Sequence, residues 1–182
     1  MSESAEQPPE PSAPPRSQIE TELRILRRHC PDAILEVTEQ PARDMHWIEI
    51  RKERLHRVAS LLRDTGELGY QMLADLFGVD YPEREDRFSV LYQLYSPGRN
   101  QRLYLRVRVE EGEAVPTLRE VFPNADWAER EVWDLFGIPF DCHPDLRRIL
   151  NPDDWEGHPL RKDYPLVGRR PVLLFNSVKD VL

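Results

Sequence analysis

The stretch RFSVLYQLYSPGRNQRLYLRVRV, residues 87–109, holds two runs of alternating apolar and polar side chains on either side of PGRN. Alternation with a period of two is typical of a strand with one buried face, and proline and glycine favour a turn. The stretch therefore predicts an antiparallel hairpin with strands at 87–96 and 101–109. The inward side chains of the second strand are Leu103, Leu105, Val107 and Val109.

The outward side of the second strand carries a row of arginines, at Arg102, Arg106 and Arg108. Such a row is commonly a solvated face of a sheet. A basic stripe on an acidic chain is also compatible with docking, and the sequence leaves both interpretations open.

Upstream of the hairpin, helix and strand patterns follow one another. Two short strands are predicted at 33–37 and 46–50. Apolar residues at helical spacing predict an amphipathic helix over 52–63. The stretch 68–81 fits a helix or a strand, and the hairpin that follows favours a strand. The residues that define the helix are Leu55, Val58, Ala59 and Leu62.

The first 16 residues contain five prolines and almost no apolar side chains. A segment of this composition buries too little surface to offset the entropy of ordering, so we expect a disordered tail. An S-x-x-E pattern at Ser17 and Glu20 predicts the start of the first helix. The predicted organisation is this tail, a core domain over 17–140, and a C-terminal segment over 141–182.

The chain has 182 residues and a formal net charge of −8. This charge argues against nucleic acid as a partner, because nucleic acid favours a basic face. No apolar run is long enough to cross a membrane, and no secretory signal is visible, so a cytoplasmic chain is expected.

Sequence motifs for cofactors are missing. Cys30 and Cys142 lie far apart, and neither belongs to a C-x-x-C pair. Glycine-rich phosphate loops are also missing. We therefore expect no redox cofactor, metal cluster or nucleotide in this chain.

The stretch WAEREVWDLFGIPF, residues 127–140, predicts an amphipathic helix with a charged outer face. In this interpretation Asp126 caps the helix, and Glu129 follows three residues later. Gly137 takes the left-handed position at the end of the helix. Ala128, Val132, Leu135 and Phe136 share the inner side, and Arg130, Glu131 and Asp134 share the outer side, with Arg130 and Asp134 as an i, i+4 pair.

The three carboxylates of this helix are also compatible with acid–base chemistry or with a divalent cation. Glu129 and Asp134, however, point to different sides of the predicted helix. The spacing therefore favours the amphipathic helix over a carboxylate active site.

Residues 137–171 show no sustained helix or strand period. Long segments of this kind in a compact domain are functional or disordered. Large apolar anchors along the segment argue against disorder and favour an extended ribbon that lies across another protein. These anchors are Phe140, Leu146, Ile149, Leu150, Trp155, Leu160 and Tyr164.

His143 and His158 each precede a proline in this segment. With Asp141 or Asp153 they offer the chemistry of metal ligands, and a metal-dependent hydrolase is one hypothesis. Their separation of 15 residues lacks a tight pair. The simpler interpretation gives each imidazole a buried carbonyl or carboxylate as its partner.

EREVWDLFGIPFDCHPDLRRIL followed by PDDWEGHPLRKDYP closely resembles the C subunit of the proton-pumping NADH:quinone oxidoreductase, respiratory complex I. The resemblance extends from Ser17 to Pro165. Cys142 stands where that family usually has glycine, and Trp133 where it usually has tyrosine. The matching signature residues and expected partner contacts are Glu129, Arg130, Glu131, Asp134, His143, Pro144, Leu146, Arg147, Arg148, Trp155, His158, Arg161, Lys162 and Tyr164.

The resemblance implies an α+β fold with a mixed, largely antiparallel sheet, helices on one side and an extended C-terminal ribbon. It implies a subunit without catalytic site or cofactor that braces the cluster- and quinone-binding subunits. NADH, flavin, iron–sulfur clusters and quinone would belong to those partners. The expected location is peripheral, on the cytoplasmic side of the cell inner membrane. The equivalent subunit of a related membrane-bound hydrogenase, or of another electron-input complex, and a soluble adaptor are the alternatives.

Overall fold

A computed structural model describes residues 19–40 and 45–166 of the chain. The proline-rich tail, Ser17 of the predicted capping pattern and the last 16 residues lie outside the described residues. The prediction of a disordered tail is therefore not tested.

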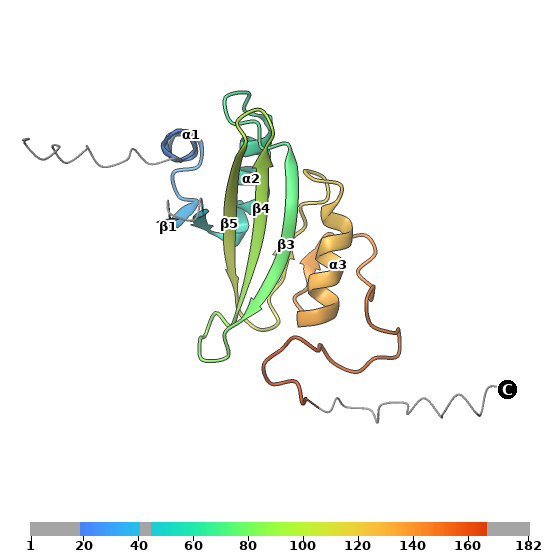
Figure 1. Ribbon diagram of the computed structural model, residues 1–182. Coiled ribbons are helices and arrows are strands. Elements are labelled where there is room, and N and C mark those ends of the chain that lie inside the picture. The colour runs from blue at the N-terminus through green and yellow to red at the C-terminus, as the bar shows by residue number, and fades with distance from the viewer. Residues whose placement is uncertain (1–18, 41–44, 167–182) are drawn as a thin grey trace, which may run out of the picture.

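A five-stranded sheet in the order β1-β2-β5-β4-β3 forms the centre of the fold (Figure 1). Neighbouring strands are antiparallel except for β2 and β5, which run parallel. The predicted hairpin is confirmed, and the ambiguous stretch 68–81 contains a strand. The strands are β1 (Ile34–Gln40), β2 (Met45–Ile50), β3 (Met72–Asp80), β4 (Phe88–Ser96) and β5 (Gln101–Val109).

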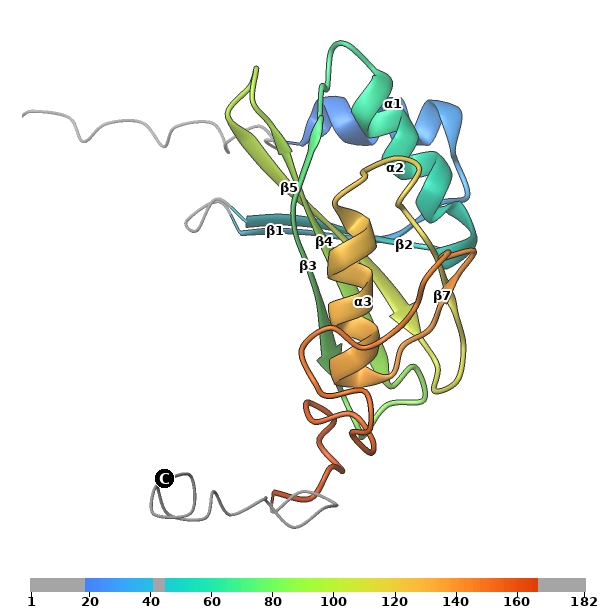
Figure 2. The same ribbon diagram turned by 90° about the vertical axis from the view of Figure 1, so that its right-hand side faces the viewer.

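The α-helices of the described residues cover one side of this sheet, as Figure 2 shows. A short parallel pair, β6 (Val115–Pro116) and β7 (Phe140–Asp141), lies outside the main sheet. None of the helices in the described ranges combines the length and apolar character that a membrane span requires. The helices are α1 (Glu20–His29), α2 (Leu55–Asp64) and α3 (Ala125–Phe136), and a 3-10 turn, η2 (Lys52–Arg54), precedes α2.

The core lies between the helices and the sheet face that alternation predicts. The four predicted inward side chains of β5 are buried, as are the four predicted apolar positions of α2. Helix α3 packs closely on β3. A Cβ added to Gly78 of β3 would lie only 2.8 Å from Cδ2 of Phe136 of α3, so the two elements leave no room for a side chain at this position. The α+β fold with helices on one side of a largely antiparallel sheet is therefore confirmed.

The arginine row lies on the opposite sheet face, as predicted, where Arg102 is exposed and Arg106 and Arg108 are paired with carboxylates of the chain. Arg106 donates from Nε to Glu49 Oε2 at 2.9 Å. Arg108 lies 2.9 Å from Glu49 Oε1 and 3.0 Å from Asp86 Oδ2. These two arginines therefore act first as ion-pair partners across the sheet.

Candidate docking site

Most charged side chains of α3 are buried rather than exposed. Glu129 and Asp134 are 0% exposed and Arg130 is 7% exposed, whereas Glu131 remains at the surface. The predicted charged outer face is wrong at Arg130 and Asp134, because the C-terminal segment covers that side of the helix. We use the name ribbon for residues 141–166, the described part of this segment.

The start of α3 also differs from the prediction. The N-cap residue is Asn124, and no side chain caps the helix. Asp126 lies within the first turn and pairs with Arg119 Nε at 2.7 Å. The end of the helix is as predicted, because Gly137 adopts the left-handed conformation with φ 76° and ψ 21°.

Glu129 binds the loop before α3. Its carboxylate accepts a hydrogen bond from Thr117 Oγ1 at 2.5 Å and one from the backbone N–H of Leu118 at 2.7 Å. Burial raises the pKa of Glu129 to about 7, and the two hydrogen bonds only partly oppose this effect. Glu129 therefore positions the 117–118 loop instead of completing a capping box.

Asp134 is the main attachment of the ribbon. Its Oδ2 accepts hydrogen bonds from the backbone N–H groups of residues 149, 150 and 151, at 3.1, 2.9 and 2.8 Å. Its Oδ1 accepts from Arg148 Nη1 at 2.6 Å and Asn151 Nδ2 at 3.0 Å. Burial alone would raise the pKa of Asp134, but these donors hold it well below its usual range.

Two arginines bind ribbon carbonyls. Arg130 donates to the carbonyl oxygens of Arg147 and Arg148, at 3.2 and 2.9 Å, in place of the predicted pair with Asp134. Arg148 bridges Asp134 and the carbonyl oxygens of Trp155 and Gly157, at 2.7 and 3.1 Å. Both guanidinium groups therefore fix the path of the backbone.

The two histidines bind backbone carbonyls, which confirms the simpler interpretation. His143 donates from Nε2 to the carbonyl of Asp126 at 3.1 Å, and His158 donates from Nδ1 to the carbonyl of Asp134 at 2.9 Å. These contacts lie eight residues apart on α3, about 12 Å along its axis. The helix therefore holds the two rings apart. Within residues 19–40 and 45–166, no three His, Cys, Asp or Glu side chains gather as a metal site requires.

A second attachment, which we call the clasp, holds the far end of the ribbon to the β3–β4 hairpin. Arg87 pairs with Asp80 at 2.8 Å and with Asp163 at 2.8 Å. Asp80 also accepts the backbone N–H of Lys162 at 2.7 Å. Arg161 pairs with Glu111 at the end of β5. The sequence alone did not point to Asp80, Arg87 and Glu111, because no local pattern links residues so far apart in the chain.

The remaining predicted contact residues differ in exposure. Leu146, Trp155 and Tyr164 are partly buried, and Leu146 packs against the core. Pro144, Arg147 and Lys162 are exposed, and Arg147 pairs with Asp145 at 2.9 Å. The exposed apolar side chains of the ribbon are Leu150, Leu160 and Leu166. The ribbon therefore presents a mixed apolar and charged surface on a fixed backbone, and its exposed acidic residues outnumber its exposed basic ones.

Comparison with known proteins gives consistent results. The C subunit of NADH-quinone oxidoreductase from Sinorhizobium medicae is 48% identical over 72% of this chain and 66% of its own length. The protein of the same name in Roseiflexus castenholzii is 47% identical over 86% of this chain and 90% of its own length. The chain spans about two thirds of the Sinorhizobium protein and nearly all of the Roseiflexus protein.

A solved structure shares the fold. A chain from the membrane-bound sulfane sulfur reductase, an archaeal respiratory membrane complex, superposes with a TM-score of 0.68 at 21% identity, over 81% of this chain and 85% of that chain. The profile of one family, described as "Respiratory-chain NADH dehydrogenase, 30 Kd subunit", matches residues 48–170, which include α3 and the ribbon. The chain therefore belongs to the family of the 30 Kd subunit of respiratory-chain NADH dehydrogenase.

Proposed function

We propose that this chain is a structural subunit of a membrane-bound NADH:quinone oxidoreductase and holds neighbouring subunits in register for electron transfer. In this proposal NADH, flavin, iron–sulfur clusters and quinone are bound by the partner subunits. The chain itself is peripheral, on the cytoplasmic side of the membrane, and attaches through those partners, chiefly the quinone-site and cluster-binding subunits.

The observation that carries the proposal is the way the ribbon is held. Asp134 and Arg130, charged groups of α3 that a reactive site would need, are used within the chain, because both bind ribbon backbone, and Arg148 of the ribbon binds it as well. A fixed ribbon loses little conformational entropy on binding, which favours a docking role.

The burial of the carboxylates supports a role without catalysis in this chain. Glu129 and Asp134 are 0% exposed, and both are hydrogen-bonded to protein groups. A substrate has no access to either carboxylate without opening the ribbon or the 117–118 loop. Their geometry serves structure rather than proton transfer.

Native gel electrophoresis of membranes tests the proposal. Leu150→Ser and Arg147→Ala change exposed ribbon side chains, so the isolated subunit should stay folded while the assembled complex falls about ten-fold. Arg28→Ala, at an exposed arginine on α1, is the matched control and should leave assembly unchanged. Quinone reductase activity per assembled complex is measured in parallel. Normal assembly of both ribbon variants with lost turnover would contradict the scaffold role.

A further inference from the structure

The sheet face opposite the helices carries an apolar and aromatic patch, which we call the open-face stripe. Register places its members on one face: Trp47 lies beside Tyr104, Leu91 beside Phe77, and Tyr95 beside Met72. Met72 is 50% exposed and Phe77 is 37% exposed. Its members lie on four neighbouring strands, β2, β5, β4 and β3, on the face that no described helix covers (Figure 2), and Gln93, Arg102 and Arg106 of the same face lie among them.

The composition of this stripe differs from that of an ordinary solvated sheet face, which alternation makes polar. Tyrosine, tryptophan, phenylalanine and methionine are enriched in the cores of protein interfaces. The rings are also ordered within the chain, since Trp47 and Tyr104 pack edge to face with centroids 6.4 Å apart. A sheet with apolar side chains on both faces requires a covering layer on each.

Arginines also lie on this face. Glu49, Glu36 and Asp86 pair with Arg106 and Arg108, whereas Arg102 is exposed, stacks on Tyr95 at 5.4 Å and forms no ion pair within the described residues. The net charge of −8 of the chain disfavours a nucleic acid or an anionic lipid surface as the partner.

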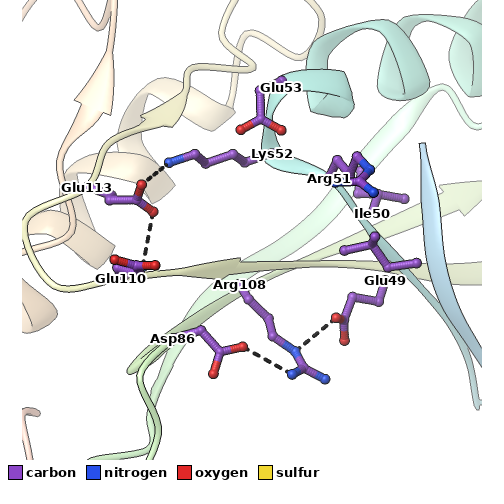
Figure 3. Close-up of a pocket in the computed structure, with 10 residues that line it drawn as sticks. Glu49, Ile50, Arg51, Lys52, Glu53, Asp86, Arg108, Glu110 and Glu113 are labelled. Carbon is purple, nitrogen blue, oxygen red and sulfur yellow. Dashed lines mark hydrogen bonds and ion pairs between the residues drawn. The ribbon is translucent and has the colours of Figure 1, made fainter. Parts of the chain in front are cut away.

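A hollow of about 350 Å³ lies where β2 and β5 end, and Glu49 and Arg108 of the same sheet face are part of its lining (Figure 3). Its lining includes five carboxylates against three basic side chains. Lys52 pairs with Glu113, and Arg108 pairs with Glu49 and Asp86, whereas Glu53 and Glu110 form no ion pair within the described part of the chain. The excess negative charge of this hollow is complementary to a lysine or arginine side chain.

We infer that the open-face stripe docks an amphipathic helix of a partner subunit, with a lysine or arginine of that helix in the hollow between Glu53 and Glu110. A helix fits because the stripe runs across strands on a sheet face, where a helix packs, rather than along a strand edge. The inference rests on the proposed function. It adds a second docking surface on the side opposite α3, so the subunit bridges two neighbours.

Site-specific photocrosslinking tests this docking. A benzoylphenylalanine at position 77, in the complex purified from membranes, should crosslink to a helix of another subunit that carries a lysine or arginine. Mass spectrometry identifies the crosslinked peptide. A crosslink to a second copy of this chain or to lipid, or no crosslink, would overturn the inference.

Charge reversal provides an independent measurement. Glu53 and Glu110 are exposed, so the double variant E53K/E110K should keep the circular dichroism spectrum and melting temperature of the isolated subunit. Assembled complex on native gels should fall about ten-fold, because a partner cation then meets two like charges. Glu120→Lys, at a side chain 84% exposed outside the hollow, is the control and should assemble normally.

The ribbon variants separate this inference from the proposed function. If Leu150→Ser blocks assembly while E53K/E110K assembles fully, the inference of a second docking surface is wrong and the proposed scaffold role stands. If all of these variants assemble fully, both ideas fail.

Discussion

Asp134 determines whether the ribbon is a fixed surface. We expect Asp134→Ala to lower the free energy of unfolding by about 3 kcal/mol, because Arg148 and three backbone N–H groups lose a buried acceptor. Urea denaturation measures the loss, and limited proteolysis should cut within residues 143–157. Glu131→Ala, on the exposed side of the same helix, is the control and should change stability by less than about 0.5 kcal/mol.

Glu129 makes stability depend on pH near neutrality. Its pKa is raised from 4.5 to about 7 in the folded chain. The contribution of Glu129 to the free energy of unfolding is therefore fully present below pH 4.5. This contribution, on the order of 3 kcal/mol, is lost as the pH rises through 7. In Glu129→Gln this part of the pH dependence should vanish in melting curves between pH 4.5 and 8. An unchanged slope would show that Glu129 is ionised throughout.

Cys142 occupies a left-handed position with φ 62°. A side chain costs about 1 kcal/mol in this conformation, and glycine avoids that cost. Cys142→Gly should therefore raise the free energy of unfolding by about 1 kcal/mol. Cys142→Ala keeps a Cβ and should give no such gain, so equal effects from the two variants would point to the thiol instead of the backbone.

At the scale of elements, the contact between α3 and β3 leaves no room at Gly78. Gly78→Ala places a methyl group against the Phe136 ring, and overpacking of this kind costs about 1–3 kcal/mol. Phe136→Leu in the same chain should recover part of the loss. A double-mutant cycle measured by urea denaturation gives the coupling, and strict additivity would rule out the steric cause.

Strands β1, β2, β4 and β5, helix α2 and the end of α3 could be predicted because local periodicity and single residues specify them, as Gly137 does, whereas β3 was favoured only by the hairpin that follows it. Alternation in β5 identified its inward side chains correctly. The burial of Glu129 and Asp134 could not be predicted in this way, because a helical pattern identifies the core side and not a loop that covers the other side. Their partners, at 117–118 and 148–151, have no period of their own.

At the scale of the whole molecule, Arg87 joins the hairpin to the ribbon. Arg87→Ala should free residues 161–166 while the part held by α3 stays protected, because the clasp binds residues 161–163 and α3 binds the stretch up to residue 160. Hydrogen exchange measured by mass spectrometry should show faster exchange only in 161–166. Arg84→Ala, in the same turn and stacked on Tyr81, is the control. Faster exchange along the whole ribbon would mean that it opens as one unit.

The parallel pairing of β2 with β5 sets the order in which the chain can fold. β5 fills the position between β2 and β4, so the sheet stays in two pieces until residue 109 has been synthesised. Until then β2 and β4 each present an unpaired edge, and such edges promote aggregation. A nascent chain stopped before Gln101 should therefore need a chaperone, whereas one extended past Val109 should need it far less. The internal position of β5 thus makes synthesis, and not only assembly, a vulnerable stage for this subunit.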